Sequence, residues 1–498
     1  MPTLAWRGSS CKDCQGAYGE DLSGGYYEAG GSYMKMALQE AFVLTQLAWT
    51  VVDFQQGLSK AGQLDEALAA LRWGASYLMA CHPQPNVFMA VQGNHSLDFE
   101  YYGPPEDYEQ WVPKGPGGRR LASYINASNP SSEIAGEAAA ALAATALAFA
   151  SSDPAYAGLA LAHSVELFMF GTTYLGSYMT SPSPGIQQHA LLYPSSGFHD
   201  ELAWAAVWLY RATGASSFLD AASNLFLAAQ ADGNSECCGY GTFSWDTKSP
   251  GVALQLATLQ PNNSQYLAAV EQFFSWYLPG PGRTVPHTNS GLAYPYQGWG
   301  ACRYAANAGM LALAYAQSLR SRAADASYAA QLFNYGQQQV SIILGSSGQS
   351  YLVGFGANFP QHVFQKDAWN SYLTWDTSSL PWTVQREDFQ ASSAPNPFIA
   401  YGAVVGGPSS LNGTSAFPDT RRMFQYTEPA LDYGGGLIGG IAILITYYAD
   451  QRPASMCDLD LGYQAPGAPA PPASLVTECG RNASSVQDAI IDVLDGCC

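Results

Sequence analysis

Helical periodicity governs most of this 498-residue chain. Apolar residues recur at spacings of three and four, and the alternation typical of strands is nearly absent. Because many periodic segments are rich in alanine and end in glycine, we expect tight helix–helix packing. No repeat of fixed period is present, so a closed ring of helical hairpins is favoured over an open solenoid. The pattern predicts eleven helices, at approximately 33–55, 64–82, 133–151, 157–173, 200–213, 215–232, 247–258, 264–279, 300–320, 326–344 and 433–449.

The charge balance argues against nucleic acid as a partner. The chain has 20 Lys and Arg against 39 Asp and Glu, a net charge of −19, whereas phosphate binding needs clustered cations. With 13% aromatic residues, the composition suits a neutral ligand that stacks on rings, such as a sugar polymer. Simple solubility of an extracellular protein explains the acidity equally well. The most apolar segment, 434–448, is too short for the roughly 20 residues of a membrane span.

Several features indicate a secreted, disulfide-containing glycoprotein. Five Asn-x-Ser/Thr sequons occur, and ten cysteines include Cys11-x-x-Cys14, the pair Cys237-Cys238 and the terminal Cys497-Cys498. Cys11 and Cys14 have no second Cys/His pair at ligand spacing, so we predict a disulfide instead of half a zinc site. No signal peptide opens the chain at Met1, which disagrees with the secretory features. The sequons are at Asn94, Asn126, Asn262, Asn412 and Asn482.

A series of motifs carries the strongest functional signal. The hexapeptide Tyr26–Gly31 follows Trp6–Ser10 and Asp21–Gly25 near the amino terminus. Further motifs follow in order, at Ser131–Ala143, Tyr193–Leu202, Phe243–Lys248, Trp299–Asn307, Ser350–Gly356 and Tyr426–Ala430. Over roughly residues 4–450, this series resembles glycoside hydrolase family nine, the cellulase family.

The resemblance implies an all-α fold, an (α/α)6 barrel of twelve helices. The family's usual first helix precedes the segment that begins at Trp6, so we expect the barrel to lack that helix in this chain. Either Met1 is not the authentic start, or another chain or segment fills the gap. Residues 1–453 then form the barrel, and residues 454–498 form a Pro/Ala linker and a cysteine-containing tail. The tail is either an attachment element or a frayed, disulfide-stapled end.

The reaction that the resemblance implies is inverting hydrolysis by two carboxyl groups. Glu428 matches the family's general acid. The family's base is the last Asp of Tyr-Tyr-Asp-Ala-Gly-Asp, and here that position is Gly31. Glu28 matches the first Asp of the motif and could replace the base only through a fortuitous geometry. Losing a positioned base typically costs about 10² to 10⁴ in rate.

The same resemblance predicts the sugar contacts. Tyr102, Trp299, Arg303 and Arg421 match cleft positions, although aromatic residues in helical proteins more often belong to the core. A second departure lies where the family has His-His-Arg and this chain has Phe364, Gln365 and Lys366. Lys366 keeps a cation without the planar fork of arginine. We expect Tyr102, Trp299, Arg303, Lys366 and Arg421 to contact substrate.

A loop after Tyr193 matches the calcium site of some family members. The corresponding ligands are Ser196, Gly197, Asp200, Glu201 and Asp246, and hard oxygen donors suit structural Ca²⁺. Alternatively, these acids only cap the helix that begins near residue 200. No organic cofactor is expected.

Three functions remain open from the sequence. The first is an extracellular or cell-surface homologue of endo-β-1,4-glucanases that has lost hydrolysis and acts as a structural or glycan-binding protein. The second is an active endoglucanase with Glu428 as acid and a relocated base. The third is a protein-assembly element that uses the vacant helix position and the tail cysteines.

Overall fold

The structure, a computed structural model, describes residues 6–112, 120–231, 241–295, 298–370 and 382–450. The tail, Cys237-Cys238 and Asn482 lie outside these residues. Eleven described helices have eleven residues or more, and each coincides with a predicted one to within four residues at either end. They are α1 (Ala37–Asp53), α3 (Leu64–Ala80), α6 (Ser132–Phe149), α7 (Pro154–Thr173), α9 (His199–Thr213), α10 (Ser216–Ala231), α11 (Ser249–Leu259), α12 (Ser264–Tyr277), α13 (Ala301–Ser321), α14 (Ala326–Ile343) and α18 (Gly435–Asp450).

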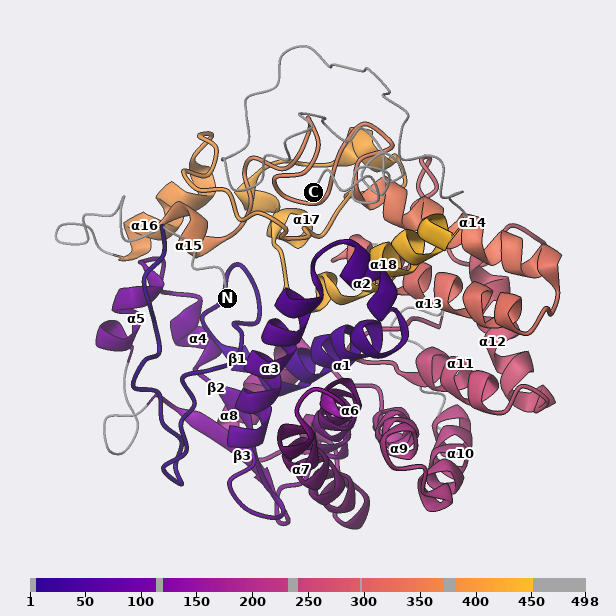
Figure 1. Ribbon diagram of the computed structural model, residues 1–498. Helices are drawn as coiled ribbons and strands as arrows, with labels where there is room; N and C mark the ends of the chain where they lie inside the picture. The colour runs from indigo at the N-terminus through magenta and orange to yellow at the C-terminus, as the bar shows by residue number, and fades with distance from the viewer. Residues whose placement is uncertain (1–5, 113–119, 232–240, 296–297, 371–381, 451–498) are drawn as a thin grey trace.

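Six of these helices form a closed inner ring. Each contacts the next in the order α1, α6, α9, α11, α13 and α18, and α18 returns to α1. Five others, α3, α7, α10, α12 and α14, lie outside the ring (Figure 1). The short helix α2 (Gln55–Lys60) contacts α18. Six inner helices, five long outer helices and the short α2 confirm the expected (α/α)6 barrel.

The inner helices are more completely buried than the outer ones. In α6, 16 of 18 residues are buried, whereas in α7 only 7 of 20 are, so α6 crosses the core and α7 covers it. Polar caps fix where these helices begin. The Ser131 hydroxyl accepts from the Ile134 amide at 3.2 Å, and the Asp153 carboxylate caps α7 ahead of Pro154. Gly214, with φ 71°, ends α9 in the left-handed conformation.

Helix α6 alone, among the described helices, is long and apolar enough to cross a membrane. Its apolar window is 89% buried within the fold, as in the core helix of a barrel.

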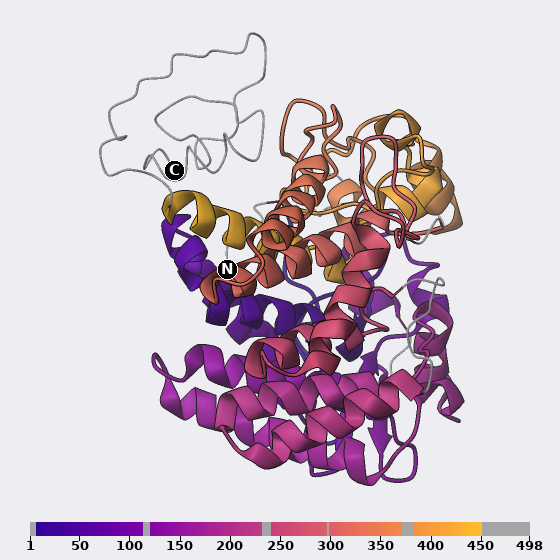
Figure 2. The same cartoon turned by 90° about the vertical axis from the view of Figure 1, so that its right-hand side faces the viewer.

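A small antiparallel sheet was not predicted. It consists of β1 (Lys35–Met36), β2 (Val87–Gln92) and β3 (Ala122–Asn126), with β2 in the middle. Strand β2 is buried on both faces, so its sequence lacks the alternation that identifies a half-exposed strand. The sheet lies beside the short helix α8 (Pro184–Leu192), and the long loops between α14 and α18 gather at the top of the molecule (Figures 1 and 2).

The predicted disulfide between Cys11 and Cys14 is present in the structure. Cys81 and Cys302 are buried free thiols.

Candidate active site

Two segments from opposite ends of the chain meet at the cleft. Ala29 pairs with Ala430 in an isolated antiparallel bridge. The Gly30 amide donates to the Pro429 carbonyl, and the Leu431 amide donates to the Glu28 carbonyl, each at 2.8 Å. These backbone bonds bring the Tyr26–Gly31 motif beside Glu428.

A cavity of about 670 Å³ opens over these two segments. Glu28 and Glu428 both line it, so the structure brings the two predicted carboxyl groups together. Nine aromatic side chains make up much of its wall, which suits stacking against sugar rings. They are Phe99, Tyr102, Tyr193, Trp245, Trp299, Tyr304, Phe364, Phe424 and Tyr433.

Glu428 is buried, and its carboxyl group is held by the backbone at position 31, where the family has its base. The Gly31 amide donates a hydrogen bond of 2.8 Å to Glu428 Oε1. Burial, together with the negative charge of Glu28, raises the pKa of Glu428 to about 8. A carboxyl group that keeps its proton at neutral pH can act as a general acid.

Glu28 has a different partner. The Tyr193 hydroxyl donates to Glu28 Oε1. Burial raises the pKa of Glu28 to about 7, although the Tyr193 hydrogen bond opposes this shift. Tyr193 belongs to a motif used to identify the family, but the sequence did not indicate its contact with Glu28.

Three of the five predicted sugar contacts line the cavity: Tyr102, Trp299 and Arg303. Trp299 is 37% exposed and meets Phe424 edge to face. The Arg303 guanidinium donates to the Asp432 carboxylate at 2.6 Å and lies over Tyr433. Asp432, which sequence reasoning missed, therefore fixes Arg303 in place.

The other two, Lys366 and Arg421, lie outside the cavity lining. The Lys366 ammonium is fully buried and donates to the Asp98 carbonyl at 2.7 Å. The Arg421 guanidinium, also buried, binds Asn396 Oδ1 and stacks over Trp369 at 4.2 Å. Lys366 thereby joins the short helices α15 (Lys366–Trp369) and α4 (His95–Asp98), and neither cation lines the cavity in which sugar contacts are expected.

The loop proposed for calcium lies next to the cleft. The Ser196 amide donates to Asp246 Oδ1 at 2.8 Å, and the Lys248 amide donates to Asp200 Oδ2 at 2.6 Å. No side-chain hydrogen bond caps α9, so Asp200 does not serve as the cap of this helix. Asp200 Oδ1 and Glu201 Oε2 are buried without hydrogen-bond partners among the described residues. Unpartnered carboxylate oxygens fit a hard cation.

The carboxylates of this loop do not by themselves form a complete set of metal ligands. Within the part of the chain that is described, one set of three His, Cys, Asp or Glu ligand atoms lies within 4.8 Å of one another, and it is Cys11, Cys14 and Glu109. Its two sulfurs form the disulfide. A calcium ion would therefore need oxygens of Ser196 and Gly197 as well as carboxylates.

A buried lysine lies between two acids beneath this loop. The Lys248 ammonium is 3.3 Å from Glu137 Oε2 and 3.1 Å from Glu201 Oε1, and all three side chains are fully buried. Although burial opposes it, these carboxylates raise the pKa of Lys248. Lys248 therefore remains charged inside the barrel.

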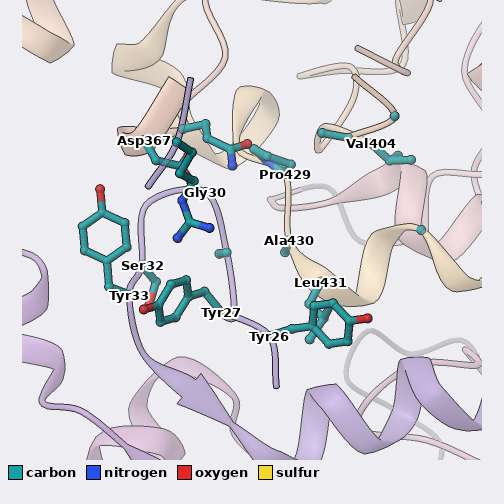
Figure 3. Close-up of a pocket in the computed structure, with 16 residues that line it drawn as sticks. Tyr26, Tyr27, Gly30, Ser32, Tyr33, Asp367, Val404, Pro429, Ala430 and Leu431 are labelled. Carbon is teal, nitrogen blue, oxygen red and sulfur yellow. The ribbon is translucent and has the colours of Figure 1, made fainter. Parts of the chain in front are cut away.

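A second, smaller cavity of about 340 Å³ borders the same two segments (Figure 3). It shares Ala29 and Ala430 with the cleft but is lined by Tyr27 and Gly30 instead of the two glutamates. The Arg7–Asp367 ion pair, at 3.0 Å, belongs to its wall. The chemistry expected of the family belongs to the larger cavity.

Known proteins share both sequence and fold with this chain. Endoglucanase 14 of Arabidopsis thaliana is 35% identical over 457 residues, which cover 88% of each chain. Endoglucanase B of Cellulomonas fimi is 34% identical over 91% of this chain, which spans only 40% of that protein.

Solved structures agree. An endoglucanase from the termite Nasutitermes takasagoensis superposes with a TM-score of 0.76 at 32% identity, covering 89% of this chain and 93% of that one. Endoglucanase CelQ from Clostridium thermocellum, complexed with cellotriose, gives 0.72 at 25% identity, covering 89% of this chain and 66% of that one. The family model described as "Glycosyl hydrolase family 9" matches residues 2–441, and the chain belongs to this family.

Proposed function

We propose that this protein binds β-1,4-glucan in the aromatic cleft and no longer hydrolyses it. The observation that carries the proposal is the contact between the Gly31 amide and the Glu428 carboxyl. An inverting hydrolase needs a second carboxylate across a gap of roughly 6.5–9.5 Å, which leaves room for a water. At position 31 this chain supplies only a backbone N–H, and that N–H holds the acid itself.

Glu28 is a poor replacement for the base. With a pKa near 7, it is only about half ionised at neutral pH, and Oε1 already accepts from Tyr193. Nevertheless, Glu28 lines the same cavity as Glu428. An active endoglucanase with Glu28 as base is therefore the second candidate function.

Glucan binding is supported by the cleft and by the relatives. The nine aromatic side chains and the fixed Arg303 offer stacking faces and hydrogen-bond donors. CelQ, which is similar over most of this chain, has been crystallised with cellotriose.

Two measurements on the purified full chain test the proposal. Titration with cellotetraose should show binding, and incubation with carboxymethyl cellulose should release no more reducing ends than the Glu428→Gln variant does. Turnover that disappears in Glu428→Gln would refute the loss of hydrolysis. If turnover also disappears in Glu28→Gln, the second candidate is supported. Absence of glucan binding would refute the binding role.

We also infer that Ca²⁺ binds the loop of Ser196, Gly197, Asp200, Glu201 and Asp246. The unpartnered oxygens of Asp200 and Glu201 support this assignment. When bound, the ion would neutralise buried carboxylates and fix the loop beside the cleft, without taking part in hydrolysis.

A secreted, N-glycosylated protein fits these features. Asn262 and Asn412 are exposed, as glycan attachment requires, and a disulfide joins Cys11 and Cys14. Treatment of the protein, secreted from a eukaryotic host, with an N-glycosidase should increase its electrophoretic mobility; unchanged mobility would refute glycosylation.

A further inference from the structure

The ring of Phe364 fills the space that a side chain at position 31 would need. A Cβ built on Gly31 would lie 2.4 Å from Phe364 Cε1 and 3.1 Å from Phe364 Cδ1. It would also lie 2.6 Å from Glu428 Oε1. Contacts under 3.0 Å essentially never occur for real Cβ atoms, so any side chain at position 31 requires a neighbour to move.

The two neighbours differ in their freedom to move. The Glu428 carboxyl is the end of a flexible side chain and can turn away. The Phe364 ring is 6% exposed and packs against two other rings, with centroid distances of 5.0 Å to Phe389 and 5.4 Å to Phe424. Tyr102 belongs to the same cluster. Its backbone is held as well, because the Phe364 amide donates to the Thr427 carbonyl. A rigid aromatic cluster therefore blocks position 31.

We propose that Phe364 and Gly31 form an interlocked pair and that Phe364 independently prevents hydrolysis. This inference rests on the proposed loss of hydrolysis. An aspartate at position 31 alone would meet the ring and could not take up the position of a base. The ring also places an apolar edge at position 31, where a water held by a base would need hydrogen-bond partners. A catalytic carboxylate therefore requires two changes, an acid at position 31 and a smaller side chain at position 364.

A stability cycle tests the steric interlock without any reference to activity. Melting temperatures are compared for the wild type, Gly31→Ala, Phe364→Leu and the double variant. Gly31→Ala should lower the melting temperature strongly when Phe364 is present and much less in the Phe364→Leu background. Leucine keeps most of the apolar volume, so the protein should remain folded. Equal losses in both backgrounds would overturn the interlock.

Gly30 supplies the matched control. A Cβ on Gly30 would lie 2.5 Å from the Phe364 carbonyl oxygen and 2.8 Å from Pro429 Cδ. Changing the Phe364 side chain does not remove either contact. Gly30→Ala should therefore destabilise the wild type and the Phe364→Leu variant equally. A rescue of Gly30→Ala by Phe364→Leu would show that the effect is not specific to the ring, and would count against the proposal.

Turnover measurements on Gly31→Asp test whether Phe364 prevents hydrolysis. Alone, it should leave turnover of cello-oligosaccharides at the wild-type background. Combined with Phe364→Ala, it should raise turnover by about 10²-fold or more, the usual contribution of a positioned base, and Glu428→Gln should remove the gain. A single Gly31→Asp variant as active as the double variant would overturn the proposal. So would a folded double variant with no gain.

The proposed function and this inference can fail separately. Turnover by the wild type that depends on Glu428 would refute the loss of hydrolysis. The stability cycle would still show whether Phe364 blocks position 31.

Discussion

Two groups of buried carboxyl groups in this barrel differ in what balances their charge. Beneath the loop proposed to bind calcium, Glu137 and Glu201 share the Lys248 ammonium. In the cleft, Glu28 and Glu428 accept hydrogen bonds from neutral donors, the Tyr193 hydroxyl and the Gly31 amide. Burial raises the carboxyl pKa values in both groups, to about 7 for Glu137 and Glu28 and to about 8 for Glu428, but the first group also contains a charged lysine. The cleft thus keeps the property that an acid needs, while no ion pair among the described residues adds to the Tyr193 hydrogen bond in keeping Glu28 ionised as a base requires.

Removing the cation should disturb the first group most. Lys248→Met leaves Glu137 and Glu201 buried without a counter-charge, and we expect a loss of about 3–5 kcal/mol in the free energy of unfolding. Denaturant unfolding measures the effect. Lys60→Met, at an exposed lysine of α2, should change stability by less than about 0.5 kcal/mol. A loss below about 1 kcal/mol for Lys248→Met would show that the cluster does not depend on its lysine.

The cleft should respond to pH. The folded-state pKa of Glu428, about 8, lies above the unfolded value near 4.5, so its contribution to stability is fully present below pH 4.5 and is lost as pH rises through 8. Glu428→Gln should remove part of this decline, about 2–4 kcal/mol, since each unit of pKa difference is worth about 1.4 kcal/mol. The free energy of unfolding, measured between pH 5 and 9, tests this. If it changes with pH equally in the wild type and in Glu428→Gln, the raised pKa of Glu428 is contradicted.

The Tyr193 hydroxyl should matter when Glu28 is ionised. Tyr193→Phe removes a hydrogen bond to a charged group, a loss of about 1.5–3 kcal/mol at pH 8 and less at pH 5. Tyr401→Phe, at a tyrosine that is 46% exposed, is the control and should have little effect at either pH. A pH-independent loss for Tyr193→Phe would indicate a packing effect instead.

Calcium should stabilise the first group further. At ten times its dissociation constant, an ion that binds only the folded state adds about 1.4 kcal/mol. A chelator should therefore lower the melting temperature, and calcium should restore it. Asp200→Asn should lose this response. If a chelator leaves the melting temperature of the wild type unchanged, calcium binding at this loop is contradicted.

The smallest expected change concerns the rim of the cleft. Trp299→Ala should weaken cellotetraose binding by about 3- to 10-fold, as expected for one stacking contact. Trp73, 45% exposed on the outer helix α3, gives the matched variant Trp73→Ala, which should leave the affinity unchanged. If both variants bind cellotetraose with equal affinity, the sugar does not stack on Trp299.

Periodicity and alanine-rich segments that end in glycine were enough to predict all eleven long helices, whereas the (α/α)6 arrangement was predicted from the family resemblance. Strand β2 escaped prediction because a strand buried on both faces carries no alternation. The motifs predicted from register that Lys366 and Arg421 contact sugar, but register does not fix the direction of a side chain, and both cations bind protein groups outside the cavity lining. The clash that a side chain at position 31 would make with Phe364 depends on a three-dimensional contact between distant segments, which a single sequence cannot reveal.

The bridge between Ala29 and Ala430 also has a consequence during synthesis. A nascent chain can build helical hairpins one after another, since their contacts are local. The binding cleft cannot exist until the ribosome has released nearly the whole barrel, because its second wall arrives about 400 residues after its first. Any truncation before residue 430 would therefore give a partial ring of helices that lacks one wall of the cleft.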